Sequence, residues 1–198
     1  MTEPVKLTLA SGNPGKLREY RALAADHRVE IVPIPEIARL PAFEESAPTF
    51  AENAAGKALH YSRFVQDAVI ADDSGLVVNA LRGAPGPRSA RYAGPAASDA
   101  DRVTKLLGEL RALPSPDRRA RFVCSLALAR TGRVLAVVSD FAEGTLLEQP
   151  RGGGGFGYDP VFFFAPLGKT FAEFSPEEKN LYSHRGRAFR KMMAFLNA

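Results

Sequence analysis

Two pairs of adjacent carboxylates are the first residues whose chemistry fits a catalytic or metal site. Glu44 stands beside Glu45 and Asp72 beside Asp73, and the sequence predicts both pairs in loops. Magnesium in proteins usually binds one or two carboxylates and completes its shell with water and substrate phosphate. Acidic pairs are more often solvated surface, but Asp72 directly follows the apolar run 68–71, and ligand sites of open α/β sheets lie where strands end. This position favours a functional site at the second pair.

A turn between a predicted strand and a predicted helix, Ser11-Gly-Asn-Pro-Gly-Lys16, has the residue types of a phosphate site. Backbone N–H groups at a helix N-terminus attract anions, the lysine adds a positive charge, and glycine lets a phosphate approach the backbone closely. The turn is not a Walker A loop, because the GxxxxGK[ST] spacing is absent and Leu17 follows the lysine. An ordinary strand-to-helix turn without a ligand explains the same residues equally well.

The glycine run 152–157 contains a GxGxxG match, but a predicted strand follows it where a dinucleotide fold requires a helix. What remains is a flexible backbone that brings Phe156, Tyr158 and Asp159 together, where an aromatic face and a carboxylate could hold a purine. The other interpretation is a β-turn with core aromatic residues.

Lys179 and the run Ser183-His-Arg185 stand near the start of the last predicted helix. Backbone donors at that helix start and a fixed guanidinium fork could address one acceptor-rich edge of a ligand. Helix capping combined with surface charge is the alternative interpretation.

The composition excludes several classes of protein. With 198 residues, 45% hydrophobic and 24% charged, we expect one globular domain over 1–198 rather than a disordered chain. The single cysteine, Cys124, cannot form an intrachain disulfide, and no CxxC zinc pattern occurs. The first residues lack the features of a secretion signal, and no apolar run approaches the ~20 residues of a membrane span. We therefore expect a cytoplasmic protein without a membrane partner.

The net charge of +4 suits an anionic partner, although it can also serve solubility alone. A basic RNA- or DNA-binding module would need clustered Lys and Arg interleaved with stacking aromatic residues, and no such stripe occurs. We expect no nucleic-acid partner.

Alternating apolar residues, helical spacing and capping boxes that begin at Thr49, Ser98 and Ser175 predict an α/β chain with a mixed sheet. The helix after Ser98 has a predicted apolar stripe, formed by Val103, Leu106, Leu107, Leu110 and Leu113. Thr131-Gly132, between two alternating runs, predicts a long β-hairpin. The predicted strands cover 5–9, 29–31, 68–71, 76–81, 121–131, 133–141 and 160–164. The predicted helices cover 17–24, 50–65, 99–113, a short segment from 176, and 184–196.

Six ordered segments resemble the inosine/xanthosine triphosphate pyrophosphatase family. They are LASGNPGKLRE (9–19), TFAENAAGKA (49–58), ADDSGL (71–76), GAPGPRSARYAG (83–94), GGFGYDPVF (154–162) and EKNLYSHRG (178–186). The resemblance implies an elongated mixed β-sheet flanked by helices, two lobes with a central active-site cleft, and a homodimer. It also implies magnesium-dependent hydrolysis of noncanonical purine nucleoside triphosphates (ITP, dITP, XTP) to the monophosphate and pyrophosphate, which cleanses the nucleotide pool.

The same resemblance assigns roles to individual residues. It implies that the metal is bound by Glu45 and Asp73, and that Asp73 is also the catalytic base for the attacking water. The triphosphate would be bound by Ser11, Gly12, Asn13, Pro14, Gly15, Lys16 and Lys57, and the nucleoside side of the substrate by Ser74, Phe156, Gly157, Tyr158, Asp159, Lys179, His184 and Arg185.

Base choice is a further prediction. Hypoxanthine and xanthine carry an oxygen at purine position 6, where adenine carries an amino group, and arginine has only donors. We therefore expect Arg185 to bond the 6-oxo group, with Tyr158 or Phe156 stacking on the base.

Two other interpretations of the function stay open. One is a non-catalytic nucleotide-binding protein on the same scaffold, which would have lost the carboxylates; the other is a pyrophosphatase for other modified nucleotides.

Overall fold

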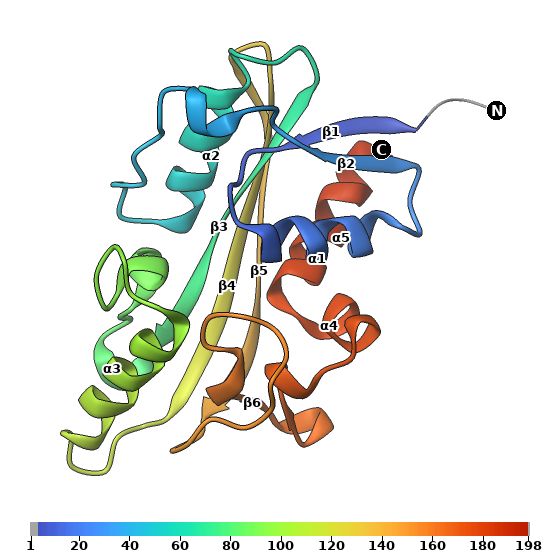
Figure 1. The fold of residues 1–198 in the computed structure, drawn as a ribbon. Helices are drawn as coiled ribbons and strands as arrows, with labels where there is room; N and C mark the ends of the chain where they lie inside the picture. Colours follow the sequence, from blue (N-terminus) through green and yellow to red (C-terminus); the bar gives the residue numbers. More distant parts are fainter. Residues whose placement is uncertain (1–3, 198) are drawn as a thin grey trace. The chain divides into compact units, whose positions relative to one another are not determined.

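The computed structural model describes residues 4–197 and contains a seven-stranded mixed sheet with helices packed against it (Figure 1). The strands are β1 (Val5–Leu9), β2 (Val29–Pro33), β3 (Ala68–Val78), β4 (Arg119–Arg130), β5 (Arg133–Leu146), β6 (Phe162–Phe164) and β7 (Lys169–Thr170). The helices are α1 (Pro14–Ala24), α2 (Phe50–Tyr61), α3 (Asp99–Arg111), α4 (Pro176–Tyr182) and α5 (His184–Leu196). Short 3-10 helices are η1 (Ile37–Arg39), η2 (Asn79–Leu81), η3 (Gly86–Arg91), η4 (Asp159–Val161), η5 (Ala165–Leu167) and η6 (Phe171–Glu173).

The strand order is β2-β1-β3-β4-β5-β6-β7. β1 pairs in parallel with both β2 and β3, whereas β6 pairs antiparallel with β5 and β7. This confirms the predicted mixed α/β fold. Among the helices described between residues 4 and 197, none is long and apolar enough to cross a membrane.

The chain forms two compact units, whose boundaries fall inside β3, β4 and β5 and after the first residue of α5. Unit 1 comprises the chain up to Asp73, the segment Cys124–Asp140 and the chain from Arg185. Unit 2 comprises Ser74–Val123 and Phe141–His184.

In unit 1, β3 is buried on both faces, which is typical of a parallel strand with helices on either side. Val69 and Ala71 belong to the core that α2 covers, and Ile70 belongs to the core of α1 and α5 (Figure 1). Successive side chains of a strand point to opposite faces, so Asp72 falls on the α1 and α5 face and Asp73 on the α2 face. The strand thereby separates two adjacent carboxylates.

Unit 2 has its own core, in which α3 packs against aromatic side chains of β4, β6 and η6. Phe122 lies 4.6 Å from Phe162 and 5.6 Å from Phe171 between ring centroids. The buried residues of α3 are Val103, Leu106, Leu107 and Leu110. They are four of the five residues of the predicted apolar stripe, whereas the fifth, Leu113, lies beyond the end of α3 and is exposed.

The structure corrects the prediction that a strand ends at Asp72. β3 runs without interruption from Ala68 to Val78, so Asp72 and Asp73 lie inside a strand and not in a loop. Their charges are accommodated by side-chain partners described below. Gly75 belongs in this strand because a Cβ there would overlap the Ser89 hydroxyl, which accepts a hydrogen bond from the N–H of Leu76 at 2.9 Å.

Other boundaries shift by a few residues. The strand predicted from 160 begins at Phe162, because Pro160 lies in the 3-10 turn η4, and the helix predicted to 65 ends at Tyr61. The hairpin prediction is confirmed: Thr131 and Gly132 have φ angles of 48° and 73°, the left-handed pair that a two-residue hairpin turn requires.

Candidate active site

The predicted phosphate turn is folded around Asn13, in unit 1 between β1 and α1. The Asn13 side-chain oxygen accepts hydrogen bonds from the N–H groups of Gly15 at 2.8 Å and Lys16 at 3.3 Å, and Pro14 occupies the first turn of α1. A Cβ at Gly12 would meet nothing within 4 Å among the described residues. The packing therefore does not require glycine at position 12, whereas a phosphate approaching the backbone would.

Lys16 extends from this turn to β3. Its Nζ donates to the Asp72 main-chain oxygen at 3.2 Å and to Asp72 Oδ1 at 2.8 Å. Asp72 Oδ2 accepts from the Tyr20 hydroxyl and from Arg185 Nε, each at 2.7 Å. Burial raises the pKa of Asp72, but the positive charges of Lys16 and Arg185 outweigh it and hold the pKa well below its usual value. Asp72 is therefore ionised although it is completely buried.

Asp73 has a different environment. Its Oδ2 accepts a hydrogen bond from Asn53 Nδ2 of α2 at 3.0 Å. Burial and the negative charge of Glu45 raise the pKa of Asp73 from 3.8 to about 6. A carboxylate with this pKa is mostly ionised at neutral pH and still able to accept a proton, which suits a general base.

Glu45 lies in the loop before α2 and is half-buried, whereas Glu44 is exposed. Glu45 Oε1 accepts from Lys57 Nζ at 2.6 Å, so a second predicted phosphate cation is held beside a predicted metal ligand. Within residues 4–197, no group of three or more His, Cys, Asp and Glu side chains is arranged as a metal cage. Magnesium is usually bound by only one or two carboxylates, with water and substrate phosphate in the rest of its shell, so it does not need a cage of three protein ligands.

The predicted nucleoside-binding residues lie mainly in unit 2, on the glycine-rich segment and on α4. Asp159 Oδ2 accepts from the N–H of Phe156 at 2.9 Å and from Lys179 Nζ at 2.6 Å. The Lys179 ammonium lies 5.2 Å from the centroid of the Phe156 ring. Gly155 has a φ of +70°, and a Cβ there would overlap the Asp159 carboxylate. Asp159 thus fixes the local path of the segment that carries Phe156.

Two further contacts hold this segment. The N–H of Gly157 donates to Asp99 Oδ2 at 2.7 Å, and the Tyr158 hydroxyl donates to the main-chain oxygen of Ser89 at 2.9 Å. The Tyr158 ring is buried and Phe156 is half-buried. Of the two aromatic residues predicted to stack on a base, Phe156 is therefore the better exposed.

The last three predicted site residues are on β3 and α5. Ser74 is half-buried and follows Asp73 on β3. His184 is buried, with its ring stacked 4.8 Å from that of Phe122. Arg185 is only 2% exposed and pairs with both Asp72 and Glu19.

The structure adds residues that the sequence did not identify as functional. Asn53 holds Asp73, Asp99 holds Gly157, and Glu19 pairs with Arg185. Asn53 could have been recognised from the sequence, because it is a polar residue on the apolar side of a predicted helix. Asp99 and Glu19 could not, because in the sequence they resemble ordinary surface carboxylates.

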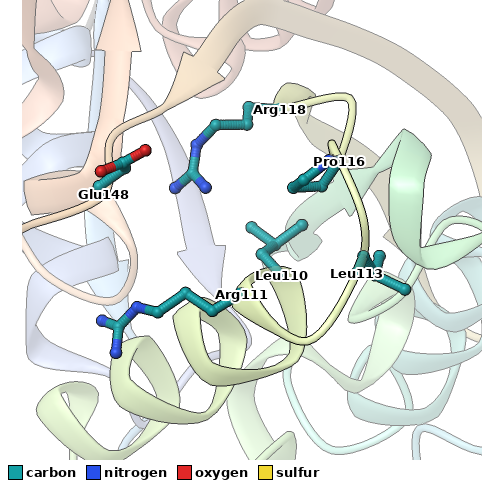
Figure 2. A pocket seen from close by; sticks show the side chains of 6 residues that line it. All are labelled: Leu110, Arg111, Leu113, Pro116, Arg118 and Glu148. Atoms are coloured by element: carbon teal, nitrogen blue, oxygen red, sulfur yellow. The ribbon is translucent and has the colours of Figure 1, made fainter.

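A cavity of about 340 Å³ elsewhere in unit 2 is unrelated to these residues. Figure 2 shows the Arg118 side chain projecting between Glu148 and Leu110. No predicted site residue lines the cavity, whose lining consists of Leu110, Arg111, Leu113, Pro116, Arg118 and Glu148. The guanidinium of Arg118 is engaged by the protein itself, because it donates to the main-chain oxygens of Leu146 and Leu147.

A family model described as the Ham1 family matches residues 7–195. The chain belongs to the Ham1 family. A dITP/XTP pyrophosphatase of Geobacillus kaustophilus is 50% identical over 187 residues, which cover 94% of this chain and 92% of the relative. A dITP/XTP pyrophosphatase of Pectobacterium atrosepticum is 47% identical over 95% of this chain and 96% of the relative.

Solved Ham1 structures share the fold. A HAM1 protein from Coxiella burnetii has a TM-score of 0.87 and 40% identity, with 98% of each chain covered. The Staphylococcus aureus Ham1 protein has a TM-score of 0.84 and 38% identity, covering 97% of this chain and 98% of that one. The resemblance predicted from the sequence is thereby confirmed at the level of family and fold.

Proposed function

We propose that this Ham1 chain hydrolyses noncanonical purine nucleoside triphosphates (ITP, dITP and XTP) to the monophosphate and pyrophosphate. The observation that carries the proposal lies in unit 1: Lys16, at the phosphate turn, is bonded to Asp72, and the next residue of β3 is Asp73, whose pKa is raised to about 6. Relatives that are up to 50% identical over nearly the whole chain are named dITP/XTP pyrophosphatases. The phosphate turn and the Asp73 carboxylate therefore support the activity for which these relatives are named.

Magnesium is the cofactor that fits the donor set. Glu45 and Asp73 would bind it, because the charge of Glu45 raises the pKa of Asp73 and a divalent cation relieves that repulsion. When bound, magnesium neutralises charge on the phosphates. Lys57, already 2.6 Å from Glu45, would add a further positive charge on the phosphate side.

The residues of the chain divide the remaining work. The turn Ser11–Lys16 and Lys57 bind and orient the triphosphate, since phosphoryl transfer is accelerated mainly by positioning and charge neutralisation. Asp73, oriented by Asn53, accepts the proton of the water that attacks the α-phosphorus. The bond between the α-phosphorus and its bridging oxygen to the β-phosphate then breaks, and pyrophosphate is released from the turn and Lys57.

In unit 2, Phe156 would stack on the purine. Asp159 and Lys179 hold Phe156 in place, the first through its backbone N–H and the second over its ring. Gly157, Tyr158, Ser74 and His184 remain proposed nucleoside contacts. Arg185, which pairs with Asp72 and Glu19, remains the proposed partner of the 6-oxo group, because a guanidinium carries only donors.

Three broader features complete the proposal. Residues 1–198 act as one functional domain, two chains form a homodimer, and the enzyme works in the cytoplasm. Of these three features, the homodimer rests on the family resemblance.

The decisive experiment incubates the purified protein with magnesium and a panel of ITP, dITP, XTP, GTP and ATP, measuring pyrophosphate and orthophosphate separately. We expect ITP, dITP and XTP to give pyrophosphate, and ATP to react far more slowly. In oxygen-18 water the label should enter the monophosphate. Release of labelled orthophosphate would contradict attack at the α-phosphorus, and turnover persisting in excess chelator would contradict the metal assignment.

A further inference from the structure

Asp72 is a buried charged residue of unit 1 to which the proposed mechanism gives no role. Its exposed fraction is 0%, and its carboxylate is bonded by side chains from two helices, Lys16 and Tyr20 of α1 and Arg185 of α5. A buried ion pair contributes little net stability, because apolar residues of similar volume often replace such a pair without loss. Stability alone therefore does not explain a buried carboxylate at position 72.

Lys16 is the partner of Asp72 with the most accessible side chain. Its side chain is 14% exposed, whereas that of Arg185 is 3% exposed and Tyr20 is fully buried. An ammonium has three N–H donors, and two of them point to Asp72 Oδ1 at 2.8 Å and to the Asp72 main-chain oxygen at 3.2 Å. With two donors engaged on one residue, the direction of the third is fixed.

Arg185 supplies a second positive charge beside the Asp72 carboxylate, in addition to that of Lys16. Lys16 donates to Oδ1, while Arg185 and Tyr20 donate to Oδ2, so the two carboxylate oxygens have separate partners. Arg185 is also paired with Glu19. Two cations, Lys16 and Arg185, therefore face two carboxylates, Asp72 and Glu19, and Asp72 Oδ1 stays available as the acceptor for the lysine.

We propose that Asp72 is a positioning residue that fixes the Lys16 ammonium, through its carboxylate and its main-chain oxygen, so that the third N–H of Lys16 meets the substrate triphosphate. A lysine side chain has many rotamers, and a cation held in place before the substrate binds loses none of that freedom in the transition state. This inference rests on the proposed function, since it concerns how the phosphate site of that reaction is organised.

A double-mutant cycle tests whether Asp72 acts through Lys16. Steady-state kcat and KM for ITP are measured for the wild type, Asp72→Asn, Lys16→Met and the double variant. We expect each single change to lower kcat/KM about tenfold or more, and Asp72→Asn to cost about threefold or less once Lys16 is already Met. Effects that multiply independently in the double variant would overturn the proposal.

Tyr20→Phe is the matched control. It removes one buried hydrogen bond from Asp72 Oδ2 but leaves both contacts of Lys16. We expect its kcat/KM to stay within about threefold of the wild type. A loss as large as that of Asp72→Asn would show that any damage to this buried cluster is sufficient, and would overturn the positioning role.

A second measurement does not depend on whether Asp72→Asn folds. The side-chain ammonium signals of the wild-type protein are recorded by nitrogen-15 NMR, with the Lys16 signal assigned by its loss in Lys16→Met. We expect slow, restricted motion at Lys16, both alone and with imidodiphosphate bound, and fast motion at Lys6, which is 51% exposed. Equal mobility of the two ammonium groups would overturn the proposal. Failure of the wild type to release pyrophosphate from ITP would instead refute the proposed function, and the NMR comparison would still decide the Lys16–Asp72 contact.

Discussion

Asp72 and Asp73 are consecutive residues of β3, yet their carboxyl groups lie on opposite faces of the strand and in opposite electrostatic environments. Lys16 and Arg185 hold the pKa of Asp72 well below its usual value against the effect of burial. Burial and the nearby Glu45 raise the pKa of Asp73 to about 6. The first carboxylate is compensated by protein cations, and the second is left in need of a proton or a metal ion. The two residues should therefore respond in opposite ways to loss of charge.

Asp73→Asn should abolish turnover and stabilise the metal-free protein. A carboxyl whose pKa is raised from 3.8 to about 6 binds its proton more tightly in the folded state. The ionised form therefore destabilises the fold increasingly between those pH values and fully above about 6. Two pKa units correspond to at most about 3 kcal/mol. In chelator at about pH 7.5, thermal unfolding of Asp73→Asn should show a gain of about 1–3 kcal/mol.

The pH dependence is the internal control for this prediction. At about pH 4 the wild-type Asp73 is protonated in the folded state, so the stability gain of Asp73→Asn should nearly disappear. A gain of the same size at both pH values would show that it has a cause other than the charge. Unchanged ITP turnover in Asp73→Asn would remove Asp73 from the mechanism.

Glu45→Gln should weaken the apparent affinity for magnesium about tenfold or more, with a smaller effect on the KM for ITP at saturating metal. The chain provides a matched control in Glu44→Gln. Glu44 is exposed, whereas Glu45 is half-buried, is paired with Lys57 and acts on the pKa of Asp73. Magnesium titrations of ITP hydrolysis compare the two variants. A larger change in Glu44→Gln would move the metal-binding role to that residue.

Arg185→Lys tests base choice better than Arg185→Ala. Arg185 pairs with Asp72 and Glu19, and removing one partner of a buried ion pair costs about 3–5 kcal/mol, so the alanine variant is expected to unfold more readily. Lysine keeps the charge but loses the guanidinium fork. If Arg185 bonds the 6-oxo group, the ITP-to-ATP ratio of kcat/KM should fall about tenfold. An unchanged ratio would limit Arg185 to the Asp72 cluster, and the base would have to be recognised by other residues.

The sequence predicted most elements because local signals determine them. The turn residues Thr131-Gly132 and the capping boxes at Ser98 and Ser175 all act within a few residues, and the structure has each of them. The continuity of β3 through Asp72 and Asp73 had no local signal, since two adjacent acids in a strand are unfavourable on their own. The two acids are tolerated because Lys16 and Arg185 bond to Asp72 and Asn53 bonds to Asp73. These partners lie on three different helices, so no pattern within a few residues of β3 predicts them.

Asp99→Ala should weaken binding of the purine without disturbing the phosphate end of the site. Asp99 Oδ2 accepts the hydrogen bond of the Gly157 N–H at 2.7 Å, and Gly157 follows Phe156, the proposed stacking residue. Gly157 has a φ of 64° and Gly155 one of 70°, and because glycine adopts many backbone conformations, such hydrogen bonds help to hold this segment in one of them. We expect KM for ITP to rise about tenfold while kcat changes less, because the loss falls on substrate binding. Asp101→Ala is the matched control, since it also removes a carboxylate from the first turn of α3, where Asp101 bonds to the Ser98 cap and not, within the described residues, to Gly157. Steady-state kinetics of both variants decide between the two roles. Equal increases in KM would mean that the helix start as a whole supports the site, and that the Asp99–Gly157 bond has no special part in holding the base.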